Sequence, residues 1–551
     1  MRREVRNGVV AGAAGLVVLA GAGVGIGAWM AHSGDQRQQV QAGDDAKPSP
    51  SVKTGPPSAT EVRTTAQRFL KAWSAQDVKA AAALTDDEKA AGTALTAYRT
   101  TAHISHVTLT PTAPTGAKVP FQVSGRIEYK GLTSPVSYAT ALTVVRDTTT
   151  GKPVVDWKPS VIHPDLGEGD QLRTGEADAP PIKAVDRAGR ELTAAQHPAL
   201  SGVLAALRER YGDKTDGKPG VEFFVDRAKA RGGAKQQPDK TLKTLSQGTP
   251  GTLHTTLDAT MQSAAEKAVA TRDHASLVAL KPSTGEVLAI ANSPAGGFDS
   301  ATQGSLAPGS TMKIVTSALL MDKGLTSPEK EHPCPQYFTY GGWKFQNLDK
   351  SKIDHGTFAQ SFAASCNNAF IKMAPKLENS DLTQEARDYF GIGLNWQTGI
   401  PSFDGSVPVQ SDAQMAASLI GQGGVRMNPL NVASLAATVR TGGFHQPYLV
   451  APSVDHRTLA RAPKTLNAST ASKLKYLMRL TATSGTGAEA MAGLSGDIGA
   501  KTGSAEVDNQ KKPNAWFTAY RDDVAAAAVV PASGHGGTNA GPLVRAVLTA
   551  G

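Results

Sequence analysis

The sequence contains a Ser-x-x-Lys tetrad that could carry out nucleophilic acyl transfer. Ser310 and Lys313 are one helical turn apart, so a helix beginning here would bring the lysine amine back onto the serine hydroxyl. Ser310 follows a Pro-Gly pair and precedes an apolar run, where free backbone N–H groups favour a developing anion. Two other such tetrads occur in polar surroundings, at Ser327/Lys330 and Ser472/Lys475. We therefore predict Ser310 as the nucleophile and Lys313 as its base.

Two further motifs supply groups that an acyl transfer would need. Ser365-Cys366-Asn367 would present a hydroxyl and an amide to one cavity from a turn between helices. Lys501-Thr-Gly-Ser504 lies on a strand-like segment, where the lysine and the hydroxyls of Thr502 and Ser504 would bind a carboxylate. Gly503 is expected to let a substrate approach the strand edge. A second Lys-Thr-Gly, at 53–55, lies in a proline-rich spacer and is predicted to be unused.

Composition places these motifs in a globular protein of several domains. The 551 residues allow three or four domains at about 150 residues each. The net charge of +9 comes without a dense Lys/Arg block with interleaved aromatics, so nucleic-acid binding is not predicted. Two cysteines exclude a disulfide-rich scaffold and a four-cysteine zinc site.

The N-terminal segment indicates export across a membrane. Three arginines precede residues 8–31, which carry no charge and are long enough to span a bilayer as a helix. The basic residues before the segment place the N-terminus inside the cell. A retained single-pass anchor is therefore predicted, with the bulk of the chain extracellular. Cleavage as a signal peptide near residues 20–22 is the alternative.

The exported part divides by composition and periodicity. Residues 32–57 read as a flexible linker. Residues 58–166 begin with helical periodicity and continue with alternating strands, which predicts a small α+β domain. Residues 167–252 are a linking subdomain. Residues 253–551 have strand-like segments at both ends and helices between them, which predicts one antiparallel sheet closed by both ends of the domain.

Residues 253–551 resemble the transpeptidase domain of the penicillin-binding proteins. The resemblance rests on the three motifs in this order and on the segments 284–289, 307–310, 421–423 and 485–488. Residues 58–166 are similar to the NTF2-like domain of class B enzymes of the methicillin-resistance type. The implied fold is multidomain α+β: a transmembrane helix, an NTF2-like cone, a linking or pedestal subdomain and a five-stranded antiparallel sheet with helices. A monofunctional class B protein is implied.

The resemblance also implies a reaction. Ser310 would attack the penultimate D-alanine of a peptidoglycan stem peptide, with Lys313 as base. Ser365 and Lys501 would pass the proton to the leaving nitrogen. Asn367 would bind the peptide, and Thr502, Gly503 and Ser504 its carboxylate end. The backbone N–H groups of Ser310 and Ser504 would form the oxyanion hole.

An amine from a neighbouring stem peptide would then take the acyl group, and β-lactams would trap Ser310. This chemistry needs no metal or cofactor, and other cell-wall synthesis proteins are candidate partners. A D,D-carboxypeptidase, a β-lactamase and a non-catalytic sensor of β-lactams or the wall are the alternatives.

Cys334 and Cys366 are expected to form a disulfide. An extracellular compartment is oxidising, and the chain offers each thiol no other cysteine partner. Such a bridge would hold the turn at Ser365 and Asn367. Two buried reduced cysteines, or a metal site that also uses His332, are the alternatives.

Overall fold

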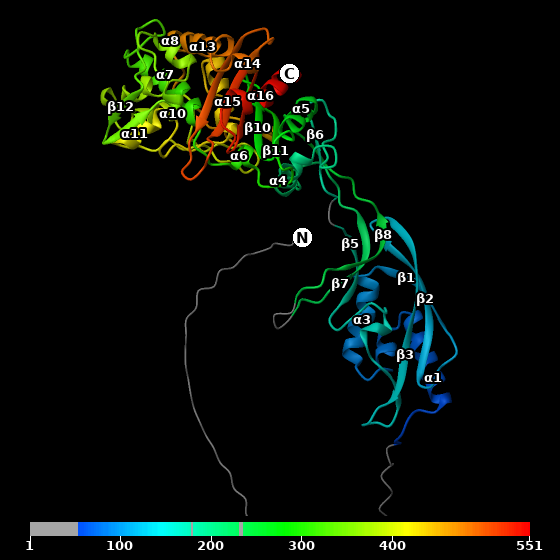
Figure 1. The fold of residues 1–551 in the computed structure, drawn as a ribbon. Coiled ribbons are helices and arrows are strands. Elements are labelled where there is room, and N and C mark those ends of the chain that lie inside the picture. Colours follow the sequence, from blue (N-terminus) through cyan, green and yellow to red (C-terminus); the bar gives the residue numbers. More distant parts are fainter. Residues whose placement is uncertain (1–52, 178–179, 231–234) are drawn as a thin grey trace, which may run out of the picture. The chain divides into compact units, whose positions relative to one another are not determined.

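The computed structural model describes residues 53–177, 180–230 and 235–551 (Figure 1). Within that part of the chain, none of the helices combines the length and the apolar character that crossing a membrane requires. The predicted membrane span at 8–31, and the linker up to residue 52, lie outside the described residues.

The first described domain has the predicted order of helices followed by strands. Three helices precede a four-stranded sheet of order β1-β2-β3-β4. The helices are α1 (Ala59–Ser74), α2 (Val78–Ala82) and α3 (Glu88–Thr100). The strands are β1 (Ile104–Pro111), β2 (Lys118–Tyr129), β3 (Leu132–Arg146) and β4 (Pro153–Asp156). Ser58 and Glu61 form the capping box that begins α1, and Phe69, Trp73 and Phe121 are buried between the helices and the sheet.

The stretch 167–252, which we predicted as one linking subdomain, contributes to the hydrophobic cores of both the N-terminal and the C-terminal domain. It holds a three-stranded sheet of order β5-β7-β8, a parallel pair of short strands and one helix. These elements are β5 (Gln171–Glu176), β6 (Lys183–Val185), α4 (Ser201–Tyr211), β7 (Val221–Asp226), β8 (Lys240–Ser246) and β9 (Thr252–His254). Leu172 and Phe223 pack in the core of the N-terminal domain, whereas Leu204 and Tyr211 pack in the core of the C-terminal domain.

The C-terminal domain is built on a five-stranded antiparallel sheet, as predicted. The strand order is β11-β10-β16-β15-β14, which joins two early strands to three late ones (Figure 1, green beside orange). The strands are β10 (Ala275–Leu280), β11 (Val287–Ser293), β14 (Ile498–Ala505), β15 (Asn514–Arg521) and β16 (Val524–Val530). β14 is an edge strand of this sheet.

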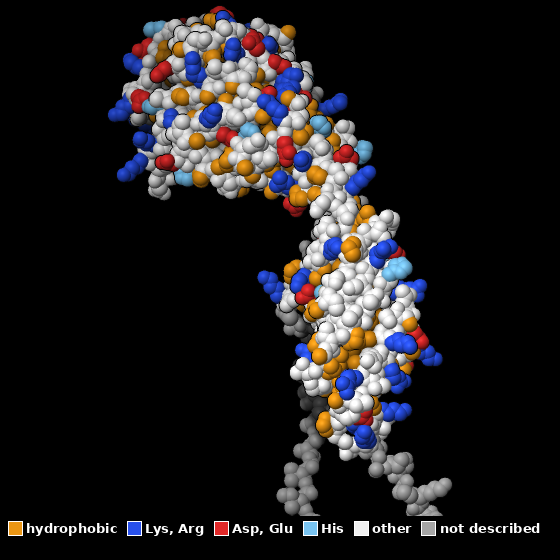
Figure 2. Space-filling model, turned by 90° about the vertical axis from the view of Figure 1, so that its right-hand side faces the viewer, with side chains coloured by type: hydrophobic (Ala, Val, Ile, Leu, Met, Phe, Trp, Pro, Cys, Tyr) orange, Lys and Arg blue, Asp and Glu red, His pale blue; other side chains and the backbone are white. Residues whose placement is uncertain are grey.

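Helices cover both faces of this sheet. On one face, α12 (Pro429–Thr441) contacts β10 and β16. On the other face, α5 (Ala259–Val269) contacts β11, and α16 (Gly541–Ala550) contacts β16. Because side chains alternate along a strand, neighbouring residues such as Leu277 and Val278 belong to different cores. Figure 2 shows basic and acidic side chains scattered among one another on the visible face of this domain.

The segment between the early and late strands is mainly helical. It contains α6 (Ser300–Gln303), the 3₁₀ helix η3 (Gly309–Met312), α7 (Lys313–Asp322), α8 (Phe358–Ala363), α9 (Asn368–Ile371), α10 (Asp381–Asp388), α11 (Asp412–Ser418), α13 (Ala468–Thr483) and α14 (Ala488–Met491). A hairpin of β12 (Tyr337–Tyr340) and β13 (Trp343–Gln346) interrupts it, and α15 (Gly536–Asn539) follows the last strand. One expectation needs correction: Ser310 lies in η3, and the buried helix α7 begins only at Lys313.

Candidate active site

The predicted nucleophile and base are in direct contact. Lys313 Nζ donates a hydrogen bond of 2.8 Å to Ser310 Oγ. It also donates to the backbone oxygen of Ser365 and to Asn367 Oδ1, each at 2.7 Å. The first contact follows from the single turn of η3, which holds Ser310 and leads directly into Lys313. The other two contacts join Lys313 to the turn at residues 365–367, more than 50 residues away in the sequence.

Burial makes the Lys313 amine a better proton acceptor than a surface lysine. Its side chain is completely buried, and its hydrogen-bond partners are a hydroxyl and two neutral oxygens. Desolvation, and after it the nearby charge of Lys501, holds the pKa of Lys313 well below its usual range. A lysine in this state can accept the proton of the Ser310 hydroxyl at neutral pH.

Ser365 stands between two lysines. It occupies the turn between α8 and α9 with a φ of 56°, in the left-handed region. Lys501 Nζ donates to Ser365 Oγ at 2.8 Å, while Lys313 holds the Ser365 backbone oxygen. Burial lowers the pKa of Lys501 to about 7. The Ser365 hydroxyl can therefore exchange a proton with an amine that is close to half-protonated at neutral pH.

The edge strand β14 brings the third motif to the same cleft. The cleft has a volume of about 390 Å³. Its lining includes Ser310, Ser365, Asn367, Thr502 and Ser504, so all three motifs contribute to it. The Thr502 hydroxyl is 2.6 Å from that of Thr486, which belongs to the 485–488 segment. The other two Ser-x-x-Lys tetrads and residues 53–55 do not line this cleft.

Gly503 has a packing role that the sequence motif did not indicate. A Cβ atom at this position would lie 3.0 Å from the Pro308 oxygen, 3.0 Å from Thr311 Cγ2 and 2.9 Å from Trp516 Cβ. The glycine is therefore needed so that β14 can pack against the segment that carries Ser310. The expectation that Gly503 lets a substrate approach the edge of β14 stays a prediction.

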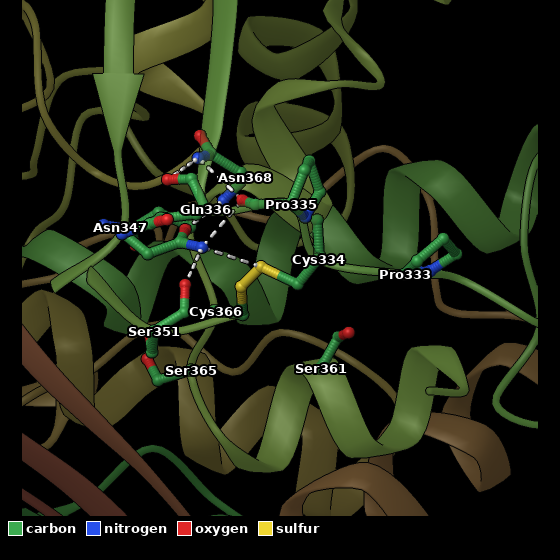
Figure 3. Close-up of a disulfide and its surroundings, with 12 residues drawn as sticks. Pro333, Cys334, Pro335, Gln336, Asn347, Ser351, Ser361, Ser365, Cys366 and Asn368 are labelled. Carbon is green, nitrogen blue, oxygen red and sulfur yellow. Dashed lines mark hydrogen bonds between the residues drawn. A yellow bond between two sulfur atoms is a disulfide. The ribbon is translucent and has the colours of Figure 1, made fainter. Parts of the chain in front are cut away.

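A disulfide and two asparagines tie the β12–β13 hairpin to the turn at Ser365 (Figure 3). Cys334 and Cys366 are joined by the disulfide. Asn368 Nδ2 donates to the backbone oxygens of Pro335 and Gln336, each at 3.0 Å. Asn347 accepts from the Asn368 N–H at 2.9 Å and donates to the Ser351 oxygen at 2.8 Å. Asn347, Ser351 and Cys366 also line the cleft, so these contacts fix the turn at the cleft wall.

The sequence motifs did not identify every residue of the cleft. Asp349, Gln422, Glu506 and His535 also line it. Gln422 lies in the 421–423 segment and Glu506 directly follows β14, so both positions carried a usable signal. His535 lies in the loop after β16, and no motif in the sequence indicated that it would line the cleft.

Two known families match the chain. Residues 275–549 match the family described as penicillin binding protein transpeptidase domain. Residues 61–170 match the family described as NTF2-like N-terminal transpeptidase domain. The two matches fall on the two domains that the sequence motifs and periodicity had separated.

Curated relatives share a moderate identity with the chain. It is 28% identical over 339 residues to the peptidoglycan D,D-transpeptidase PbpA of Mycobacterium tuberculosis, which covers 50% of this chain and 66% of that protein. It is 24% identical over 262 residues to the peptidoglycan D,D-transpeptidase MrdA of Acinetobacter baumannii, which covers 41% and 38%. The chain thus spans just under two thirds of the length of PbpA.

Solved structures share the fold. A chain of a peptidoglycan synthase complex aligns with a TM-score of 0.55, covering 70% of this chain and 92% of that one. Penicillin-binding protein 3 of Mycobacterium tuberculosis, solved in its apo form and with ampicillin, aligns with a TM-score of 0.54 and covers 68% of this chain. Both are 20% identical to it, so these likenesses establish the fold.

Proposed function

Because the chain belongs to the penicillin-binding protein transpeptidase family, as a class B member with an NTF2-like domain, we propose that it is a serine-type peptidoglycan D,D-transpeptidase. It would cross-link stem peptides through an acyl-enzyme on Ser310. One observation carries the proposal: the desolvated amine of Lys313 lies 2.8 Å from the Oγ of Ser310, and Ser310 lines a cleft to which all three motifs contribute. The names of PbpA and MrdA support the same reaction.

In the acylation step, Ser310 Oγ attacks the carbonyl carbon of the penultimate D-alanine and Lys313 takes its proton. The backbone N–H groups of Ser310 and Ser504 stabilise the oxyanion, and losing one such donor typically costs about 3 kcal/mol of transition-state stabilisation. Ser365 hands a proton to the leaving D-alanine nitrogen, with Lys501 behind it at 2.8 Å. The C–N bond breaks as the ester forms.

The substrate is held by the remaining motif residues. Asn367 binds the peptide amide, while Lys501, Thr502 and Ser504 bind the terminal carboxylate; Gly503 keeps this strand against η3. A β-lactam presents the same carbonyl and carboxylate, so it acylates Ser310 and remains attached. The ampicillin complex of the structurally similar penicillin-binding protein 3 supports this ligand class.

We further propose that residues 8–31 anchor the protein in the cell membrane with the catalytic domain outside. The charge-free run and the preceding arginines support this topology. Other cell-wall synthesis proteins are proposed partners, since one structural neighbour comes from a peptidoglycan synthase complex.

Labelling with fluorescent penicillin tests the function. A soluble fragment of residues 32–551 should acquire the label, whereas Ser310→Ala and Lys313→Ala should lose it because the two residues act as one nucleophile–base unit. The matched controls are Ser327→Ala and Lys330→Ala, which alter a tetrad outside the cleft and should label normally. Equal labelling of Ser310→Ala and the wild type would refute the assignment. An adduct that hydrolyses within seconds would favour a β-lactamase.

A further inference from the structure

A second groove lies beside the active-site cleft. It has a volume of about 840 Å³, and its walls come from the loop before α8, the end of α8, the end of α13 and the loop after α13. His355, Ser484 and Gly485 line only this groove, whereas Ala364 and Thr486 line both the groove and the cleft. The two depressions therefore meet at Ala364 and Thr486.

A backbone hydrogen bond and close packing hold the two segments together at this junction. The Thr486 N–H donates to the Ala363 oxygen at 3.1 Å, which joins the loop after α13 to the end of α8. A Cβ atom at Gly485 would lie 2.6 Å from that same oxygen, so a larger residue here would separate the two segments. The small residues at 363 and 485 therefore let the loop after α13 pack directly against the end of α8, with Ala364 and Thr486 lining both depressions.

The junction also leads to the group that can take a proton from an incoming amine. Ala364 directly precedes Ser365, whose Oγ accepts from Lys501. Burial lowers the pKa of Lys501 to about 7, which leaves part of the lysine population neutral at that pH. A nucleophile arriving past Ala364 would meet this pair before it reaches Ser310.

The charge of the groove suits an amine that must lose its proton. His355 is the only ionisable side chain among the described lining residues of this groove. A carboxylate there would form an ion pair with an ammonium group and hold its proton in place. The groove offers no such partner along its walls.

We propose that this groove is the acceptor subsite, which binds the amine-bearing side chain of a second stem peptide and directs it past Ala364 and Thr486 to the acyl-enzyme. The inference rests on the proposed transpeptidase function and assigns the location of its second substrate.

The step balances without a further reactant. The amine nitrogen forms a bond to the ester carbonyl carbon, and the bond between that carbon and Ser310 Oγ breaks. The proton released by the amine passes to the Ser365–Lys501 pair, and Lys313 returns a proton to Ser310 Oγ.

A partition experiment tests the groove. The enzyme is acylated with a synthetic D-alanyl thioester donor and then offered a tripeptide with a free lysine side-chain amine. Mass spectrometry measures the ratio of peptide transfer to hydrolysis. Ser484→Trp fills the groove from the end of α13 and should lower this ratio by at least about tenfold, because a nucleophile displaced by an ångström or more loses its attack geometry.

Two comparisons make the test specific. Ser472→Trp places the same residue on an exposed position of the same helix, about 18 Å away along its axis, and should leave the ratio unchanged. Hydroxylamine is small enough to reach the ester from solvent, so Ser484→Trp should spare its reaction. His355→Trp obstructs the groove from the loop before α8 and should repeat the loss, so a folding defect in only one of the two variants would not decide the test.

The possible outcomes separate the two proposals. A wild type that forms no acyl-enzyme would refute the proposed function and the groove with it. A labelled wild type whose peptide-transfer ratio is unaffected by both Ser484→Trp and His355→Trp would refute the groove alone. Equal losses with the peptide and with hydroxylamine would also refute it, because the substitution would then act on the ester itself.

Discussion

Two buried lysines divide the chemistry of the cleft at the scale of single residues. Lys313 contacts the nucleophile directly, while Lys501 reaches Ser365 and the Thr502 backbone oxygen. Desolvation lowers both pKa values, and the charge of Lys501 lowers that of Lys313 further. The lowered pKa values let both amines transfer protons near neutral pH. They also lower the free energy of unfolding, because both lysines bind protons more tightly in the unfolded chain.

The first residue-scale prediction concerns Lys501 and pH. The pKa of Lys501 is about 7 in the folded protein, whereas an ordinary lysine, as in the unfolded chain, has a pKa of 10.5. Between these two pH values Lys501 is protonated in the unfolded chain but mostly neutral in the folded protein. The free energy of unfolding should therefore rise with pH across this window. From pH 7 to 9 the contribution is on the order of 2 kcal/mol.

Urea unfolding of the wild type and of Lys501→Met at pH 7 and pH 9 measures that contribution. The variant should show a smaller rise with pH. Lys512→Met removes the same charge from an exposed loop position and should behave as the wild type. An identical rise in wild type and Lys501→Met would contradict the prediction.

The second residue-scale prediction concerns the glycine of the third motif. Gly503→Ala should slow acylation by penicillin and lower the free energy of unfolding by about 1–3 kcal/mol, because the new methyl group presses β14 away from Pro308 and Thr311. Gly92→Ala is the matched control, because Gly92 lies within helix α3 and a Cβ atom there has room. Its only neighbour would be Ala82 Cβ at 3.7 Å, an ordinary contact distance. This substitution should stabilise the protein by about 0.5–1 kcal/mol. Thermal melts of the two variants with the same sign of change would refute this account.

At the scale of secondary-structure elements, the turn between α8 and α9 depends on a hairpin outside the cleft. The disulfide and Asn368 attach the segment that leads into β12 to this turn, and Asn347, which directly follows β13, accepts from the Asn368 N–H. Ser365 holds a left-handed backbone conformation there, which a non-glycine residue adopts at some cost. The surrounding attachments compensate for that cost.

Loss of the disulfide should therefore affect both stability and acylation. The cysteines are 32 residues apart, and the chain-entropy model assigns a loop of this size about 3–4 kcal/mol. The double variant Cys334→Ala/Cys366→Ala should lose about that much unfolding free energy and acylate more slowly, with Ser310 still labelled. Reductant should reproduce the effect in the wild type and leave the double variant unchanged. Two free thiols in unreduced, secreted protein would show that the bridge does not form.

At the scale of the whole molecule, the hydrophobic cores of the two domains share one linking stretch. β6 pairs with β9, and α4 buries Val203, Leu204 and Leu207 in the core of the C-terminal domain. β5, β7 and β8 contribute instead to the other core. The chain passes from one domain core to the other more than once between residues 167 and 252. A truncation at any one position in this stretch therefore removes residues that one of the two domains needs.

This arrangement predicts how truncations behave. A fragment of residues 253–551 should melt at a lower temperature than residues 32–551 and aggregate, because it loses α4 and the partner of β9. Each buried aliphatic side chain removed with α4 contributes about 1.5–3 kcal/mol. A fragment of residues 58–551 keeps both cores and should melt like the longer one in calorimetry. Equal melting of 253–551 and 32–551 would show that α4 is dispensable.

Contacts within one or two turns of the chain were predictable from the sequence alone. The spacing of Ser310 and Lys313 follows from helical periodicity, and the capping box at Ser58 and the alternating strands follow from equally local rules. The five-stranded sheet followed as well, because apolar strands at both ends of a domain have few ways to bury both faces.

Contacts between distant segments were decided by the tertiary structure. Lys501 meets Ser365 across 136 residues, and Gly503 is required by the packing of η3 and Trp516. The division of 167–252 between two cores and the groove beside the cleft arise in the same way. Periodicity sets which face of an element is apolar, but which partner covers that face depends on how the whole chain packs.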